Sequence, residues 1–100
     1  MLAKILIERQ FSTGNEKEIL SLLNKLRSLA MNQPGYISGL TMRAPEDPDN
    51  MMVIGTWQSL DSWHAWKENA DRKNLEAMLE IYQDGATEYQ EYVVGSGLIV

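Results

Sequence analysis

The hydrophobic pattern of this chain switches repeatedly between a period of two and a period of three to four residues, and this alternation constrains the fold more than any other feature. Residues 2–11 have the period of two and are predicted to form a strand. One face of this strand is apolar and is broken only by Arg9. The other face mixes Leu2 and Leu6 with polar residues, so we expect something to cover part of it.

A helix is predicted to follow this strand. Ser12-Thr13-Gly14-Asn15 interrupts the strand pattern, and Asn15 with Glu18 forms a pair that resembles a capping box. Apolar residues then recur at spacings of three and four, which favours a helix over about residues 16–31. Pro34-Gly35 ends it, because proline cannot donate to the helix and disfavours helical geometry before it.

Two strands joined by a hairpin loop are predicted next. Residues 36–42 alternate, with Tyr36 and Gly39 on opposite faces. Residues 45–50 contain two prolines and three acids, so we predict a loop and not a strand there. Residues 51–57 alternate again and form the third predicted strand.

Two helical stretches and a last strand complete the pattern. Ser59 is a suitable N-cap for the first stretch, and residues 68–71 are expected to bend or break the helical region. Asp84-Gly85 ends the second stretch, and residues 87–94 are predicted to be a strand. The apolar stripe of the second stretch is predicted at Leu75, Met78, Leu79 and Tyr82.

The predicted order of strand, helix, strand, strand, helix and strand is that of an α+β, ferredoxin-like βαββαβ fold, with helices on one face of a four-stranded antiparallel sheet. We expect residues 1–100 to form one such domain. The open sheet face would leave residues such as Leu2, Leu6, Leu40 and Met42 in water, so we predict a homodimer that pairs through this face. A monomer with a partly apolar sheet is the alternative. The apolar end at residues 98–100 would lie on the partner or be frayed.

Charge and composition exclude several classes of function. The net charge of −5 argues against binding to nucleic acid or to an anionic membrane. The absence of cysteine excludes thiolate nucleophiles and cysteine-based metal sites. We see no signal peptide and no apolar run of transmembrane length, so we expect a cytoplasmic protein. No phosphate-binding glycine loop, HExxH motif or metal-ligand cluster is visible, so we expect no cofactor.

The second half of the sequence carries a family resemblance. From Ile54 it reads IGTWQSLDSWHAWKENADRKNLEAMLE, a strand that ends in tryptophan, a short polar turn and an aromatic helix. The first half has an N-terminal strand, a helix introduced by glycine and a polar cap, and then PGYISGLTMR. Over about residues 2–94 these features resemble the antibiotic biosynthesis monooxygenase family. The resemblance implies a ferredoxin-like dimer. Characterised members of the family include cofactor-independent oxygenases of polycyclic phenols or quinols and a haem-degrading branch, and many members have no proven activity.

The haem-degrading branch of that family uses an asparagine on the first strand, a tryptophan on the helix after the third strand, and an iron-ligating histidine ten residues later. Trp66 matches the tryptophan. Ile7 stands in the place of the asparagine, and Glu76 stands in the place of the histidine. His64 cannot easily substitute, because two residues of helix turn it about 160° away from Trp66. The resemblance therefore argues against haem degradation of this kind.

The candidate catalytic residues are His64 and Trp66. Histidine is the side chain that most readily titrates near neutral pH, and His64 is the single histidine. It would act as a general base on a phenolic proton; alternatively, it is a surface residue of a short helix. Asn69 and Arg72 are candidate substrate-binding residues that could donate to a substrate oxygen or a developing peroxide. Alternatively, they cap or cover a helix.

Aromatic side chains are concentrated in this chain, which has three tryptophans and four tyrosines. Flat side chains suit a planar aromatic ligand. We predict that Trp66 lines a cavity between helix and sheet, that Tyr36 and Trp57 bind substrate, and that Trp63 belongs to the core. The alternative is that most of them are core. The six methionines either line an adaptable pocket or pack in the core or the dimer.

These observations leave three hypotheses for the function. The first is an oxidoreductase, a cofactor-independent monooxygenase that oxidises a small phenolic, quinol or polycyclic aromatic substrate with dioxygen. The second is a non-catalytic dimeric module that binds a small aromatic ligand. The third is a haem-binding protein that lacks the haem-degrading residues.

Overall fold

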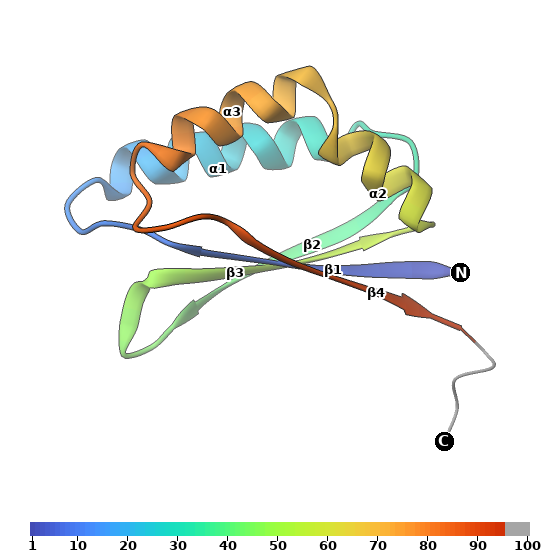
Figure 1. The fold of residues 1–100 in the computed structure, drawn as a ribbon, viewed down its shortest axis with the longest axis horizontal. Coiled ribbons are helices and arrows are strands. Elements are labelled where there is room, and N and C mark those ends of the chain that lie inside the picture. The colour runs from blue at the N-terminus through green and yellow to red at the C-terminus, as the bar shows by residue number, and fades with distance from the viewer. Residues whose placement is uncertain (96–100) are drawn as a thin grey trace.

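The computed structural model describes residues 1–95. Four antiparallel strands form a sheet in the order β2-β3-β1-β4, and the helices cover one of its faces (Figure 1). The predicted α+β ferredoxin-like fold is confirmed. The strands are β1 (Leu2–Gln10), β2 (Tyr36–Ala44), β3 (Asp47–Trp57) and β4 (Glu88–Val94). The helices are α1 (Glu16–Ala30), α2 (Leu60–Lys67) and α3 (Ala70–Glu80).

The helix starts show which of the predicted caps operate. Ser59 Oγ accepts a hydrogen bond from the Ser62 backbone N–H at 3.1 Å, as expected of an N-cap. Asn69 Oδ1 accepts from the backbone N–H of Asp71 at 2.9 Å, which starts α3 and breaks the helical region where the sequence predicted. Asn15 precedes α1, but its side chain makes no capping hydrogen bond, so the predicted capping box does not form.

The core lies between β1 and the helices. Ala3 and Ile5 of β1 are fully buried, and the apolar stripe of α1 packs above them. Trp63 is 1% exposed, which confirms the prediction that it belongs to the core. The predicted stripe of α3 is partly wrong, because Met78 is 48% exposed. Leu79 is buried as predicted, and Leu75 and Tyr82 pack partly buried against the core. The other buried residues of α3 are Arg72 and Glu76, which the stripe did not include.

The predicted hairpin loop at residues 45–50 is wrong in its extent. Residues 45–46 form the turn, and β3 already begins at Asp47, which pairs with Ala44. A register shift follows this pair, and β1 ends opposite Asn50. Pro48 is therefore paired with no residue of β1 or β2, and its missing N–H removes no hydrogen bond from the sheet.

A second irregularity changes the face on which Tyr36 lies. Tyr36 pairs with Trp57 and Ser38 pairs with Thr56, so Ile37 is an extra residue in β2. A bulge of this kind turns the preceding side chain to the opposite face. Tyr36 therefore shares the helix-covered face with Gly39, whereas simple alternation placed the two on opposite faces.

The open face of the sheet carries the predicted apolar residues. The pairing of the strands places Leu40, Ile54 and Leu6 in one row across β2, β3 and β1. In the next row Met42 and Met52 are paired. The segment predicted to contact a partner, residues 98–100, lies outside the described residues. Between residues 1 and 95, no helix combines the length and the apolar character that crossing a membrane would require.

Candidate functional site

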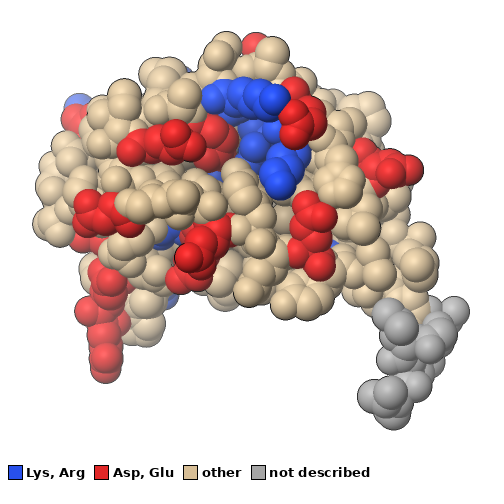
Figure 2. Space-filling model, viewed as in Figure 1, with Lys and Arg blue, Asp and Glu red and all other residues tan. Residues whose placement is uncertain are grey.

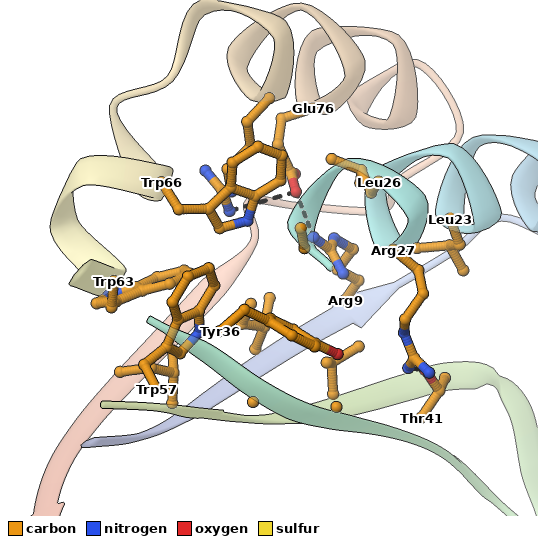
Figure 3. Close-up of a pocket in the computed structure, with 17 residues that line it drawn as sticks. Arg9, Leu23, Leu26, Arg27, Tyr36, Thr41, Trp57, Trp63, Trp66 and Glu76 are labelled. Atoms are coloured by element: carbon orange, nitrogen blue, oxygen red, sulfur yellow. Dashed lines mark hydrogen bonds and ion pairs between the residues drawn. The ribbon is translucent and has the colours of Figure 1, made fainter. Parts of the chain in front are cut away.

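A cavity of about 80 Å³ lies between the helices and the sheet (Figure 3). One water needs roughly 10–15 Å³ on this scale, so the cavity can hold several waters or a small organic group. All three helices and three of the four strands contribute to its lining. The lining is aromatic at one end, with Tyr36, Trp57, Trp63 and Trp66, and charged beneath α3, with Arg9, Arg72 and Glu76.

Two glycines form part of the floor of the cavity. Gly39 of β2 and Gly55 of β3 are directly paired, so neither strand projects a side chain upward at this point. A Cβ at Gly39 would lie 2.8 Å from Tyr36 Oη, and a Cβ at Gly55 would lie 3.4 Å from Trp57 Nε1. Glycine weakens a strand interior and often marks the close approach of another group. Here the bare backbone makes room for Tyr36 and for the cavity beside it.

The aromatic end is a connected series of rings. Tyr36 meets Trp57 edge to face, with ring centroids 5.3 Å apart and planes at 88°. Trp57 is 6.1 Å from Trp63, which is 6.0 Å from Tyr89. Aromatic pairs in such arrangements stabilise each other beyond their buried area. Together with Trp66, these rings give the cavity flat aromatic walls at this end (Figure 3).

Three charged side chains are buried at the top of the cavity. Arg9 Nη2 donates to Glu76 Oε1, and Arg72 Nη2 lies 3.4 Å from the same oxygen. The side chains of both arginines are 5% exposed and that of Glu76 is 9% exposed. Arg72 also donates to the hydroxyl of Tyr89 at 2.7 Å. Two guanidinium groups and one carboxylate leave an excess of one positive charge inside the protein.

The outer edges of this charged cluster have no partner. Within the described residues, neither Arg9 Nε nor Glu76 Oε2 makes a hydrogen bond, although both atoms are buried. Figure 3 shows the two side chains pointing toward each other from β1 and α3. The balance differs on the face of the molecule in Figure 2, where acidic side chains are widely spread and basic side chains gather mainly near the centre. The protein as a whole carries −5, but this interior site is cationic.

The end of the cavity opposite Trp63 leads toward the surface. Arg27 Nη2 of α1 donates to Thr41 Oγ1 of β2 at 2.9 Å, and both residues line the cavity (Figure 3). Arg27 is half-buried and Thr41 is exposed. This hydrogen bond therefore bridges the helix layer and the edge strand where the cavity meets solvent.

Four of the six residues that the sequence indicated for the site line this cavity. They are Trp66, Tyr36, Trp57 and Arg72. Asn69 does not line it, because its side chain caps α3. The predicted roles of all six in catalysis or binding remain predictions.

His64 lies outside the cavity. Its side chain is 50% exposed, and its Nε2 is 3.0 Å from Glu91 Oε1 of β4. Trp63 Nε1 donates to the other oxygen of Glu91 at 2.7 Å. The hydrogen bond with His64, assisted by that from Trp63, holds the pKa of Glu91 below its ordinary value of 4.5, although partial burial acts in the opposite direction. His64 thus helps to attach α2 to β4.

Sequence reasoning missed Arg9 and Glu76 as site residues. Arg9 was visible only as the charge that breaks the apolar face of the first strand. Glu76 lies four residues after Arg72, on the same face of α3. Charged pairs at this spacing are common on solvated helix faces, so nothing in the sequence indicated that this pair is buried. In residues 1–95, no three His, Cys, Asp or Glu side chains are grouped so that they could hold a metal ion.

These features define the class of the protein. It is a ferredoxin-like α+β protein with an aromatic and cationic cavity beneath its helices. The family model described as antibiotic biosynthesis monooxygenase matches residues 3–93. The chain therefore belongs to the antibiotic biosynthesis monooxygenase family, as its sequence resemblance indicated. No curated protein sequence gives a significant match.

Solved structures agree with this fold at low sequence identity. A conserved protein from Methanosarcina mazei Go1 has a TM-score of 0.86 at 17% identity, covering 92% of this chain and 91% of its own. SnoaB, a cofactor-independent oxygenase from Streptomyces nogalater, has a TM-score of 0.83 at 13% identity, covering 97% and 96%. Rv0793 from Mycobacterium tuberculosis has a TM-score of 0.84 at 7% identity, covering 96% and 97%. At sequence identities this low, the structural similarity establishes the shared fold alone.

Proposed function

We propose that this protein is a monooxygenase that oxidises a small phenol or quinol with dioxygen in the cavity beneath its helices. The observation that carries the proposal is the cavity itself, with flat aromatic walls above a floor of paired glycines. A planar ring fits such a space because flat surfaces meet it on several sides. Family membership supports the class of reaction, and SnoaB supplies an example of this fold described as a cofactor-independent oxygenase.

The reaction we propose draws its electrons from the substrate. A phenol with a hydrogen para to its hydroxyl becomes a quinone, one oxygen atom of O₂ enters the ring, and the other leaves as water. The phenol loses four electrons, and O₂ gains them. The protein would hold the ring, exclude bulk water and stabilise the negative charge that develops on oxygen. Arg9 and Arg72 supply positive charge next to the cavity.

Within this scheme, Trp57, Trp66 and Tyr36 contact the ring of the substrate, and Arg72 contributes to the field around its oxygen. Trp66 is 5% exposed, so nearly all of its ring lies inside the protein beside the cavity. We assign no role in the cavity to His64 or Asn69, because hydrogen bonds hold both side chains elsewhere. The comparison of variants described next tests the predicted base separately.

Oxygen uptake with a panel of quinols and hydroxynaphthoquinones tests the proposal. Trp66→Ala should remove most of the activity, whereas Met78→Ala, an exposed apolar residue on α3, should retain it. His64→Ala should also remain active, and its inactivity would restore the general-base prediction. If no compound is consumed faster by the wild type than by Trp66→Ala, the monooxygenase proposal is wrong.

A second candidate function is the binding of a small aromatic ligand without turnover. One observation favours it: the carboxylate in the cavity, Glu76, is engaged by two arginines, and His64 lies outside. Among the described residues that line the cavity, no other carboxylate and no histidine is present to act as a base. This candidate predicts that ligands quench tryptophan fluorescence with no oxygen uptake. The haem-binding alternative gains no support from this cavity, because none of the described residues that line it is a histidine that could ligate iron.

We also propose that two copies pair through their open sheet faces, as the sequence predicted. Leu40 is 58% exposed and Met42 is 40% exposed on this face, next to Ile54 and Leu6. An apolar patch of this kind on a soluble protein usually marks an interface. Pairing would bury it and leave the helix-covered cavity in each copy intact.

A further inference from the structure

The charged cluster at the top of the cavity has a net charge that no described residue of the cluster balances. Arg9, Arg72 and Glu76 are each at least nine-tenths buried, and together they hold an excess of one positive charge. An uncompensated charge in a protein interior is strongly unfavourable, and a bound anion would compensate it. A ligand carrying a single negative charge would make this site neutral.

The unpartnered atoms add a second requirement. Arg9 Nε is a donor and therefore needs an acceptor oxygen, while Glu76 Oε2 is an acceptor and needs a hydroxyl or N–H. Buried polar atoms without a partner are rare and each needs an explanation. One ligand oxygen that is ionised and a neighbouring oxygen that keeps its proton would satisfy both atoms at once.

We propose that Arg9 and Glu76 form a two-point recognition site for an aromatic monoanion with two neighbouring oxygens, such as a catechol or an adjacent hydroxy-carbonyl compound. The ionised oxygen accepts from Arg9 Nε, and the neighbouring hydroxyl donates to Glu76 Oε2. This inference rests on the proposed function, because it uses the same cavity, and it identifies the substrate class and the residues that select it.

The charge of the whole protein indicates how such a ligand arrives. The net charge of −5 disfavours the approach of an anion through the acidic surface. The neutral phenol therefore enters and releases its proton to solvent on binding, because Arg9 stabilises only the ionised form. The site thus lowers the pKa of its ligand, and this effect is measurable in the ligand itself.

Three coloured probes test this proposal in the wild-type protein. 4-Nitrocatechol has two neighbouring hydroxyls, 4-nitrophenol has one, and 2-methoxy-4-nitrophenol has its second oxygen blocked by methyl. All three change their visible spectrum on ionisation. Fluorescence titration should show 4-nitrocatechol binding at least about tenfold more tightly than the other two, the effect of one hydrogen bond to a charged group. Below the solution pKa of the probe, bound 4-nitrocatechol should show the spectrum of the monoanion.

A pair of matched variants identifies the residue responsible. Arg9→Gln should abolish the ionisation of bound 4-nitrocatechol and weaken its binding at least tenfold. Arg43→Gln should change neither property, because Arg43 is exposed and pairs with Glu16 on the surface. Circular dichroism verifies that both variants are folded, and the wild-type comparison stands even if Arg9→Gln does not fold.

Equal affinity for 4-nitrocatechol and 4-nitrophenol, or a bound probe that stays neutral, overturns the two-point site. If oxygen uptake with quinols still depends on Trp66, the proposed function survives that result. If none of the probes binds and no quinol is oxidised, both proposals fall together.

Discussion

Replacing Glu76 by glutamine should destabilise the fold far more than its small chemical change implies. The substitution keeps the size of the side chain, so packing is preserved, but the cluster changes from an excess of one positive charge to an excess of two. Removing one partner of a buried ion pair typically costs about 3–5 kcal/mol. For a domain of this size that corresponds to a fall in Tm of roughly 12 °C or more.

Urea unfolding followed by tryptophan fluorescence measures this difference. The matched control is Glu16→Gln, since Glu16 pairs with Arg43 on the surface and is 65% exposed. Such pairs contribute about 0–1 kcal/mol, and salt weakens them further. Arg9→Gln should cost less than Glu76→Gln, because it removes the excess charge while Arg72 remains 3.4 Å from the carboxylate. A Glu76→Gln variant as stable as Glu16→Gln, or more stable than Arg9→Gln, would refute the charge argument.

Three further predictions follow from contacts elsewhere in the fold. Gly39→Ala should cost about 1–3 kcal/mol by crowding Tyr36 Oη, and adding Tyr36→Phe should restore part of this stability, as a urea-unfolding double-mutant cycle would show. Glu91→Gln should lower the Tm at pH 7, because ionised Glu91 stabilises the folded state. The difference in Tm should disappear as the pH falls below 4.5 and through the lowered pKa of Glu91, where the carboxylate is protonated. A difference in Tm that does not change with pH would contradict this reasoning. Leu40→Glu should convert the proposed dimer into a monomer in sedimentation velocity, and an unchanged sedimentation coefficient would show that this face is not the interface.

The order of elements and the aromatic end of the cavity could be predicted because both depend on local pattern. The switch of hydrophobic period gives each strand and helix, and three aromatic residues indicated from sequence line the cavity: Tyr36, Trp57 and Trp66. The strand at residues 47–50 was missed, because the prolines there argue against a ladder. The structure shows that Pro48 lies beyond the end of β1 and beside a register shift.

The charged part of the site could not be predicted for a different reason. Arg9 and Glu76 are separated by 67 residues, and only the packing of α3 over β1 brings them together. A single inserted residue, Ile37, was also invisible to an analysis of alternation, yet it decides that Tyr36 faces the cavity. Charge pairs between distant residues and local bulges can both be recognised only once the three-dimensional arrangement is known.

The paired glycines have a consequence for motion. β2 is an edge strand, and at Gly39 and Gly55 the two paired strands have no side chains of their own to pack against each other, although Tyr36 and Trp57 lie over the pair. Local openings are easiest where apolar contacts are few. We therefore expect the amides of β2 around Gly39 to exchange with deuterium faster than those of the central strand β1. Transient parting of this edge beside Thr41 would let a molecule wider than the resting entrance pass while the rest of the sheet stays closed.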